Sequence, residues 1–431
     1  MKLLNKTVAL PKLTWRRGLA AVGILLVLAV AGLYLAATAF PSIGANSADS
    51  LRAVIGDQAV AQLETWIFQA QDSFRQIKYG LGLEKPAAPW QPPAAAQVPS
   101  PSPAPSATPT ATPLNTLAPT ATPLPQATAE PTARPTATPL PTIPPSPTPT
   151  PWRPTAAHAL GSLEGEGIWQ AYIKDAKGAA VAYRTFIQPD PKRPYAVVAV
   201  VAFDLKKARL NYVLGTDEPS IKGGPRGTGL IPTADAQPGV LLATFNGGFK
   251  ATHGSYGAMS GGTVALPPHK GLAILVIYKD GRVDIGEYGK DITSLDNALA
   301  WRQNCSLIIE NSQVNPLVHN NSAEFWGANL NGETVTWRSG AGISPDGNTF
   351  YYFAGPNMMM PVLAAAMQAV DVKAGLQLDI NNYWVHFTAI RNQAGSNKPE
   401  GLFPDEMKVD ISRYLQKYSR DFFYVALKEN N

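Results

Sequence analysis

The stretch Leu241-Leu242-Ala243-Thr244-Phe245-Asn246-Gly247-Gly248-Phe249 sets the organisation of the chain. It begins as a short apolar run with the character of a strand and stops at an Asn-Gly-Gly turn. Glycine lets the backbone take a positive φ and approach a ligand closely, while asparagine offers both a donor and an acceptor. Two interpretations stay open: a binding site at the end of a strand, or a tight hairpin turn, for which Asn-Gly is a common signal.

Apolar runs bounded by turn residues predict a sheet-rich domain around this stretch. We expect strands at residues 168–173, 179–186, 195–203, 210–214, 240–245, 272–278, 283–285, 306–309, 349–353 and 375–379. Asp280-Gly281 and Pro345-Asp346-Gly347 predict turns. The spacing of apolar residues predicts one helix over residues 357–372. The pattern indicates an α+β fold with large sheets and few helices.

Charge and cysteine content exclude several classes of protein. From His158 onward the chain has 25 Lys and Arg against 25 Asp and Glu, so this part is neutral and lacks the basic excess typical of nucleic-acid binding. The single cysteine, Cys305, excludes an internal disulfide and a cysteine-based metal cluster. The five histidines have no spacing that suggests zinc. We therefore expect no metal, no cofactor and no nucleic-acid partner.

The N-terminal region predicts a membrane anchor. Residues 1–17 are basic, and residues 18–40 form an uncharged apolar run long enough to cross a bilayer as a helix. The positive charges precede the run, so residues 1–17 are expected in the cytoplasm and the rest of the chain outside it, as in a single-pass cell-membrane protein. Cleavage as a signal peptide near Ala37-Thr38-Ala39 is the competing interpretation, although the apolar run is longer than usual for one.

Three further segments follow the anchor. Residues 48–82 have the periodicity of an amphipathic helix, which could pack on a partner copy, the bilayer surface or the C-terminal domain, or serve as a spacer. Residues 86–157 are rich in Pro, Thr, Ala and Ser and predict an extended, disordered linker, which at about 3.1 Å per residue could reach roughly 200 Å. Residues 158–431 form the head domain. The expected architecture is anchor, stalk and head.

The head resembles the phosphodiester glycosidase family in four blocks between Thr244 and Asn382. The blocks are Asn246-Gly247-Gly248-Phe249, Tyr256-Gly257-Ala258-Met259-Ser260-Gly261-Gly262, Arg338-Ser339-Gly340-Ala341-Gly342-Ile343 with Asp346-Gly347, and Leu378-Asp379. The resemblance implies the fold of that family and cleavage of the bond between a sugar C1 and the oxygen of a phosphodiester. Its expected partner is a carbohydrate or sugar phosphate.

The implied reaction assigns roles to charged residues. A phosphate leaving group needs a fixed cation, for which Arg338 is the candidate, with a surface pairing to Glu333 as the alternative. A carboxylate must stabilise the growing positive charge on the sugar or activate water. Asp379, at the end of an apolar strand, is the first candidate, with the capping of a turn as its alternative. Glu310, which closes a similar strand, is the second, with a solvated loop residue as its alternative.

Further residues are candidates for substrate binding, and a second function stays open. The binding candidates are Asn246, Gly247, Gly248, Lys250, His253 and Asn381. After Asp379 the chain reads Ile380-Asn381-Asn382-Tyr383-Trp384, where the family has glycines and serine. A non-catalytic domain that binds carbohydrate or sugar phosphate is therefore the alternative. Convergence of Asn246, Arg338 and Asp379 on an open pocket would favour the enzyme, and a buried Asp379 beneath Tyr383 or Trp384 would favour the binding domain.

Overall fold

The computed structural model describes residues 52, 54–91, 151–320, 326 and 333–428. The segments predicted at residues 1–17 and 18–40, and most of the predicted linker, lie outside these ranges. All of the described residues except Pro151 belong to one compact unit, made of residues 1–93 and 152–431. Within the described ranges, no helix is long and apolar enough to cross a membrane.

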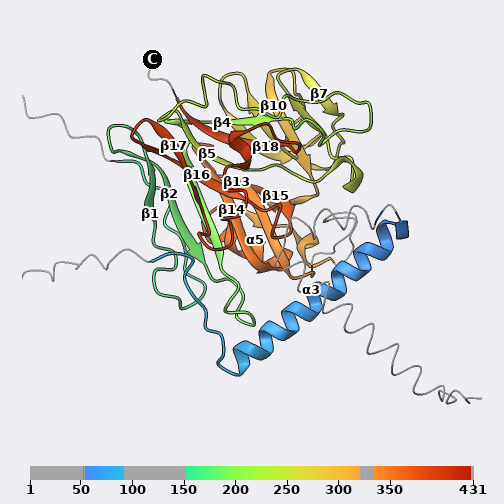
Figure 1. The fold of residues 1–431 in the computed structure, drawn as a ribbon, viewed down its shortest axis with the longest axis vertical. Coiled ribbons are helices and arrows are strands. Elements are labelled where there is room, and N and C mark those ends of the chain that lie inside the picture. Colours follow the sequence, from blue (N-terminus) through green and yellow to red (C-terminus); the bar gives the residue numbers. More distant parts are fainter. Residues whose placement is uncertain (1–51, 53, 92–150, 321–325, 327–332, 429–431) are drawn as a thin grey trace, which may run out of the picture. The chain divides into compact units, whose positions relative to one another are not determined.

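Sheet A, with eight strands in the described part of the chain, is the largest element of the fold (Figure 1). In spatial order its strands are β1 (Gln170–Lys174), β2 (Ala180–Ile187), β3 (Val198–Asp204), β14 (Thr349–Met358), β13 (Thr336–Ile343), β15 (Ala374–Ile380), β11 (Leu307–Glu310) and β12 (Gln313–Val314). Neighbouring strands run antiparallel. Every residue of β3 is buried, because both faces of sheet A are covered.

Two five-stranded antiparallel sheets complete the described strands. Sheet B has the order β17 (Ser396–Gly401), β16 (Phe387–Gln393), β5 (Leu241–Asn246), β18 (Phe422–Leu427) and β4 (Ala208–Val213). Sheet C has the order β7 (Thr263–Leu266), β6 (Ala258–Ser260), β10 (Ala298–Asn304), β8 (Ala273–Tyr278) and β9 (Val283–Glu287). The apolar run Leu241–Asn246 therefore forms the central strand of sheet B.

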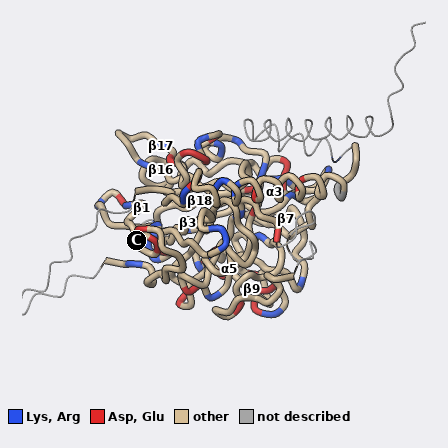
Figure 2. Tube along the Cα trace, turned by 90° about the horizontal axis from the view of Figure 1, so that it is seen from below, with Lys and Arg blue, Asp and Glu red and all other residues tan. Residues whose placement is uncertain are grey.

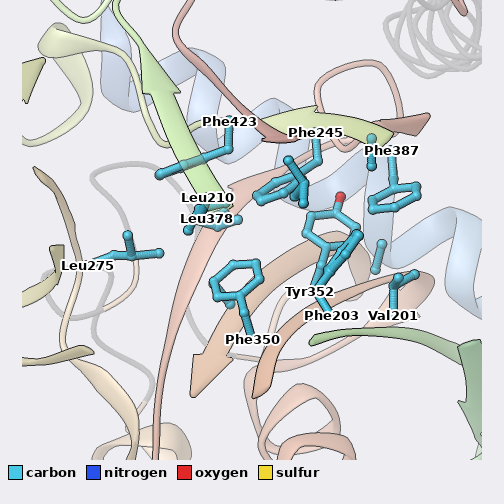
Figure 3. Packing of buried hydrophobic residues seen from close by; sticks show 14 of the residues in the cluster. Val201, Phe203, Leu210, Phe245, Leu275, Phe350, Tyr352, Leu378, Phe387 and Phe423 are labelled. Carbon is cyan, nitrogen blue, oxygen red and sulfur yellow. The ribbon is translucent and has the colours of Figure 1, made fainter. Parts of the chain in front are cut away.

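The main core lies between sheet A and the two smaller sheets. Figure 3 shows its aromatic centre, where the ring centroid of Phe245 lies 4.8 Å from that of Tyr352 and 5.3 Å from that of Phe423. A second apolar cluster covers the other face of sheet A with helix α5 (Met360–Gln368). This layering explains the sheet-rich α+β character, because one large sheet needs apolar cover on both faces.

The helix over residues 357–372 is shorter than predicted. Strand β14 continues through Met358, whose register partner is Thr336 of β13, so pairing between strands extends the sheet into the predicted helix. At the other end, Asp371 takes a positive φ of 55° in the turn before β15. The predicted turns at Asp280-Gly281 and Pro345-Asp346-Gly347 are confirmed as the β8–β9 and β13–β14 connections.

Helix α3 (Asp57–Gly80) lies within the segment predicted as an amphipathic helix. Short 3-10 helices η1 (Ala251–His253), η2 (Pro316–His319) and η3 (Arg413–Leu415) occur in the connections of the head. Figure 2 shows basic and acidic residues interspersed along the described trace. Helix η1 and the residues just before β18 lie next to the end of β5. They shape the candidate site.

Candidate functional site

Asn246 ends β5 and joins sheet B to sheet A. Its Oδ1 accepts hydrogen bonds from Tyr352 Oη at 2.8 Å and from the backbone N–H of His386 at 3.1 Å. Its Nδ2 donates to Ser339 Oγ at 3.0 Å and to the carbonyl oxygen of Gly247 at 2.9 Å. The side chain is only 2% exposed. Since β5 pairs with β16 and β18, Asn246 is not in a hairpin turn but in a buried polar link between two sheets.

The glycines after Asn246 make room for a buried ion pair. A Cβ on Gly247 would lie 2.1 Å from Asp421 Oδ2, and one on Gly248 would lie 3.0 Å from Arg302 Cζ. Arg302 Nε donates to Asp421 Oδ2 at 2.9 Å, and both side chains are 1% exposed. Tyr212 Oη and the N–H of Gly248 donate to the same carboxylate oxygen. These glycines therefore serve close packing against charged side chains.

A second buried pair, Asp379 with Arg420, lies next to the first. Arg420 Nη2 donates to Asp379 Oδ2 at 2.7 Å and to the carbonyl oxygen of Gly248 at 2.9 Å. Asp379 is 4% exposed and Arg420 is 6% exposed. Burial raises the pKa of Asp379 to about 6, although the charge of Arg420 opposes this rise. Ser339 Oγ donates to the carbonyl oxygen of Asp379 and accepts from Asn246, so Asn246 and Asp379 are connected through one hydroxyl.

Glu218 is a further carboxylate of this site, and sequence analysis missed it. It lies between β4 and β5, and its Oε2 accepts a hydrogen bond at 2.8 Å from the N–H of Ala251, the first residue of η1. Burial raises the pKa of Glu218, while this hydrogen bond and the charges of Arg420 and Lys250 lower it. Arg420 therefore interacts electrostatically with three carboxylates, Asp379, Asp421 and Glu218. No sequence motif marks Glu218, which is far from the other residues along the chain.

Aromatic and basic side chains cover this group of charges. The guanidinium of Arg420 lies 4.2 Å from the ring centroid of Trp384, and Lys250 Nζ lies 5.4 Å from the same ring. Trp384 is half-buried and packs on Tyr383, with the ring centroids 4.7 Å apart. His253, also half-buried, ends η1 three residues after Lys250. Arg420 and Lys250 thus both lie over the ring of Trp384.

The turn after Asp379 is built around an asparagine. Asn381 takes a positive φ of 82°, which asparagine adopts more readily than most residues. Its Oδ1 accepts a hydrogen bond from the N–H of Tyr383 at 3.0 Å, and its N–H donates to the carbonyl oxygen of Trp337 at 3.0 Å. Ile380 remains in β15 and does not need a positive φ. The contacts of Asn381 shape the turn that carries Trp384.

Arg338 lies next to Asp379 in the sheet but directs its guanidinium elsewhere. It is fully buried and donates to Gln377 Oε1 at 2.7 Å, to the carbonyl oxygen of Met358 at 3.0 Å and to that of Thr334 at 2.9 Å. Burial lowers its pKa to about 10. Arg338 is therefore not a surface arginine, and these contacts hold β13, β14 and β15 together.

Glu310 lies at the other end of β15 from Asp379. It belongs to β11, where Leu307 pairs with Leu376 and Ile309 pairs with Gly375, so the antiparallel register carries Glu310 away from Asp379. Its carboxylate pairs with Lys290 at the surface. The structure thus groups Asp379, Asn246, the two glycines and Lys250, while Glu310 lies apart.

Among the described residues, no group of three or more His, Cys, Asp or Glu side chains could hold a metal ion. The charges of the site are balanced instead by arginine and lysine. A fixed guanidinium in such a site can donate hydrogen bonds to an anionic group.

No protein-family model matches the chain, and no curated protein matches it. Among solved structures, the chain is similar to the catalytic domain of zebrafish N-acetylglucosamine-1-phosphodiester alpha-N-acetylglucosaminidase, auto-inhibited by its pro-peptide. That match has a TM-score of 0.37 and 13% identity, over 61% of this chain and 88% of the zebrafish chain. A hypothetical protein from Synechocystis matches with a TM-score of 0.30 and 10% identity, over 60% of this chain and 62% of that chain. At these values the structural relationship is distant.

Proposed function

We propose that the head is an extracytoplasmic, membrane-anchored hydrolase of the phosphodiester glycosidase type, acting on a sugar-1-phosphodiester or a related envelope glycan. The observation that carries this proposal is the pair of carboxylates, Asp379 and Glu218, whose pKa values are both raised by burial and which share the charge of Arg420. Raised carboxyl pKa values beside a cation are suited to acid–base work near neutral pH.

In this proposal Arg420 neutralises the phosphate. Its Nη2 is occupied by Asp379 and Gly248, while its Nε and Nη1 make no hydrogen bond to any of the residues described. In the proposed complex, phosphate oxygens accept hydrogen bonds from these N–H groups. Lys250, beside the same indole ring, adds a second positive charge. The departing phosphomonoester is already acidic, so a fixed positive charge assists its departure more than a proton donor does.

The two carboxylates take different roles because their surroundings differ. Asp379 is ionised above about pH 6, and as an anion it stabilises the positive charge that grows on the sugar ring. Glu218 is half-buried and therefore closer to solvent, which suits it to remove a proton from the attacking water. Water adds to C1 of the sugar, the C1–O bond breaks, and the phosphomonoester leaves with the bonding electrons.

A second function, binding of sugar phosphate without turnover, is favoured by one observation. Asp379 is buried and paired with Arg420, whose guanidinium lies against the ring of Trp384. The burial of Asp379 and this cover on its partner favour the binding domain. In that case the ring of Trp384 and the charges of Lys250 and Arg420 would hold the ligand, and Asp379 would only position Arg420.

The test is hydrolysis of a panel of fluorogenic sugar-1-phosphodiesters by the full chain in detergent. We expect Asp379→Asn and Glu218→Gln each to lower kcat/KM at least about 100-fold. The matched control is Asp217→Asn, which changes the neighbouring, exposed carboxylate that pairs with Arg226 and should keep full activity. Thermal unfolding of each variant shows whether a loss of activity reflects a loss of fold.

The same protein samples separate the two functions. If wild type turns over no substrate but binds a sugar 1-phosphate in calorimetry, and Arg420→Ala loses that binding, the domain is a binding module. If neither turnover nor binding is measurable across the panel, both proposals for this site fail.

A further inference from the structure

Helix α3 has an outward face with large exposed apolar side chains. From residue 59 to residue 80, the exposed residues are Trp66, Phe74 and Ile77 together with Ala, Gln, Ser and Gly residues. The Lys78 side chain is 42% exposed, and its Nζ lies over the Phe74 ring, 5.9 Å from the centroid. Trp66 is 62% exposed, and Phe74 and Ile77 are each 58% exposed. The apolar face continues past the helix with Leu81 and Leu83, which are 69% and 71% exposed. A surface helix normally turns such residues inward.

The charged residues of α3 are instead turned towards the head or paired. Asp72 is buried and accepts hydrogen bonds from Arg193 Nη2 at 2.7 Å and Nε at 2.9 Å, and from Tyr195 Oη at 3.2 Å. Tyr79 packs on Tyr195, with the ring centroids 5.7 Å apart. Arg75 pairs with Glu84 just beyond the helix. The helix is thus fixed to the head by its polar side, and its apolar side is left outward.

The described residues before and after the Pro-rich segment contact the same strand of the head, β2. Before it, Trp90 is 9% exposed and packs on Phe186 of β2, with the guanidinium of Arg184 4.3 Å from its ring centroid. After it, Trp152 packs on Tyr183 of β2, with the ring centroids 5.6 Å apart. The residues on both sides of the segment are therefore fixed to the head.

We propose that the outward face of α3 lies on the lipid surface of the membrane and holds the head there. This inference rests on the proposed membrane anchor. Between the end of the apolar run at residue 40 and the start of α3 at Asp57 there are only 16 residues, which span at most about 55 Å. A bilayer interface accommodates a face with Trp and Phe side chains and a lysine at its border.

The test uses the full chain in phosphatidylcholine vesicles with an environment-sensitive fluorophore on single introduced cysteines. Cys305 is buried, so the native thiol stays unlabelled in the folded protein. Trp66→Cys and Ile77→Cys place the probe on the α3 face. Ile221→Cys, at a position 59% exposed in the head, is the matched control. We expect lipids carrying a nitroxide near the headgroup to quench the fluorescence of probes at positions 66 and 77 at least about two-fold more than that of a probe at position 221. Aqueous iodide should show the opposite order.

Two outcomes overturn the proposal. Iodide quenching at positions 66 and 77 as strong as at 221 would leave the face in water. Shielding of both positions from iodide and from nitroxide lipid alike, with pyrene excimers between labelled copies, would make the face an interface between two chains. Unfolding measurements on each variant confirm that the head is intact.

A second measurement separates this arrangement from a stalk. A donor at Ile221→Cys and an acceptor lipid report the distance of the head from the bilayer. Deleting residues 101–140 should leave the energy transfer unchanged if α3 holds the head, and should increase it if the Pro-rich segment separates head and membrane. Both readouts are independent of catalysis, so a failure of the proposed enzyme function would not affect them.

Discussion

The pH dependence of stability offers a test of the Asp379 environment that needs no substrate. Burial raises the pKa of Asp379 from 3.8 to about 6 in the folded protein, despite the hydrogen bond from Arg420. Below about pH 4 the carboxyl group is protonated in both the folded and the unfolded chain. Between about pH 4 and pH 6 only the unfolded chain releases this proton, so the folded state loses relative stability as the pH rises.

The size of the effect follows from the displacement of the pKa. Each pH unit between the folded and unfolded pKa values corresponds to about 1.4 kcal/mol, so a displacement of about two units amounts to about 3 kcal/mol. We expect wild type to lose this amount relative to Asp379→Asn between pH 3.5 and pH 7.5. Asparagine keeps the shape of the side chain but cannot ionise, so it lacks this contribution at every pH.

The assay is urea unfolding of the full chain at several pH values, followed by tryptophan fluorescence. Leu378→Val is the control, because Leu378 is a fully buried neighbour on the same strand and its truncation lowers stability without changing an ionisable group. The free energy of unfolding of Leu378→Val, plotted against pH, should run parallel to that of wild type. If the difference between wild type and Asp379→Asn stays constant with pH, Arg420 has offset the effect of burial completely, and the argument for a raised pKa is wrong.

Two further substitutions test the packing and the extent of the site. Gly247→Ala places a methyl group 2.1 Å from Asp421 Oδ2 and should lower the free energy of unfolding by at least about 3 kcal/mol. In the control Gly80→Ala, no atom lies within 4 Å of the new methyl group, so the free energy of unfolding should not fall in this way. Thermal unfolding compares the two variants. Glu310→Gln breaks the surface pair with Lys290 and should leave turnover of any active substrate unchanged. A loss of turnover in that variant would show that Glu310 takes part in catalysis.

Much of the sheet framework could be predicted from local pattern. Strands such as β3 and β8 are continuous apolar runs, and the turn after β8 carries an Asp-Gly signal, so periodicity and turn chemistry were sufficient. Strand β10 was missed because it carries Arg302, Gln303 and Asn304, which point into buried polar contacts and interrupt the apolar pattern. Polar residues that pair inside a protein look like surface residues in a sequence.

The sequence by itself determined the apolar strands, the Asn-Gly-Gly stop and the strand that ends on Asp379, because these depend on neighbours along the chain. Only the tertiary structure decided which carboxylates interact with Arg420. Asp379 lies 41 residues away from it in sequence, and Glu218 comes from before the central strand of sheet B. Likewise, the periodicity of α3 indicates a helix, but only the contact between Asp72 and Arg193 decides which face is outward. Ion pairs inside a fold join residues that are distant along the chain, so no local pattern records them.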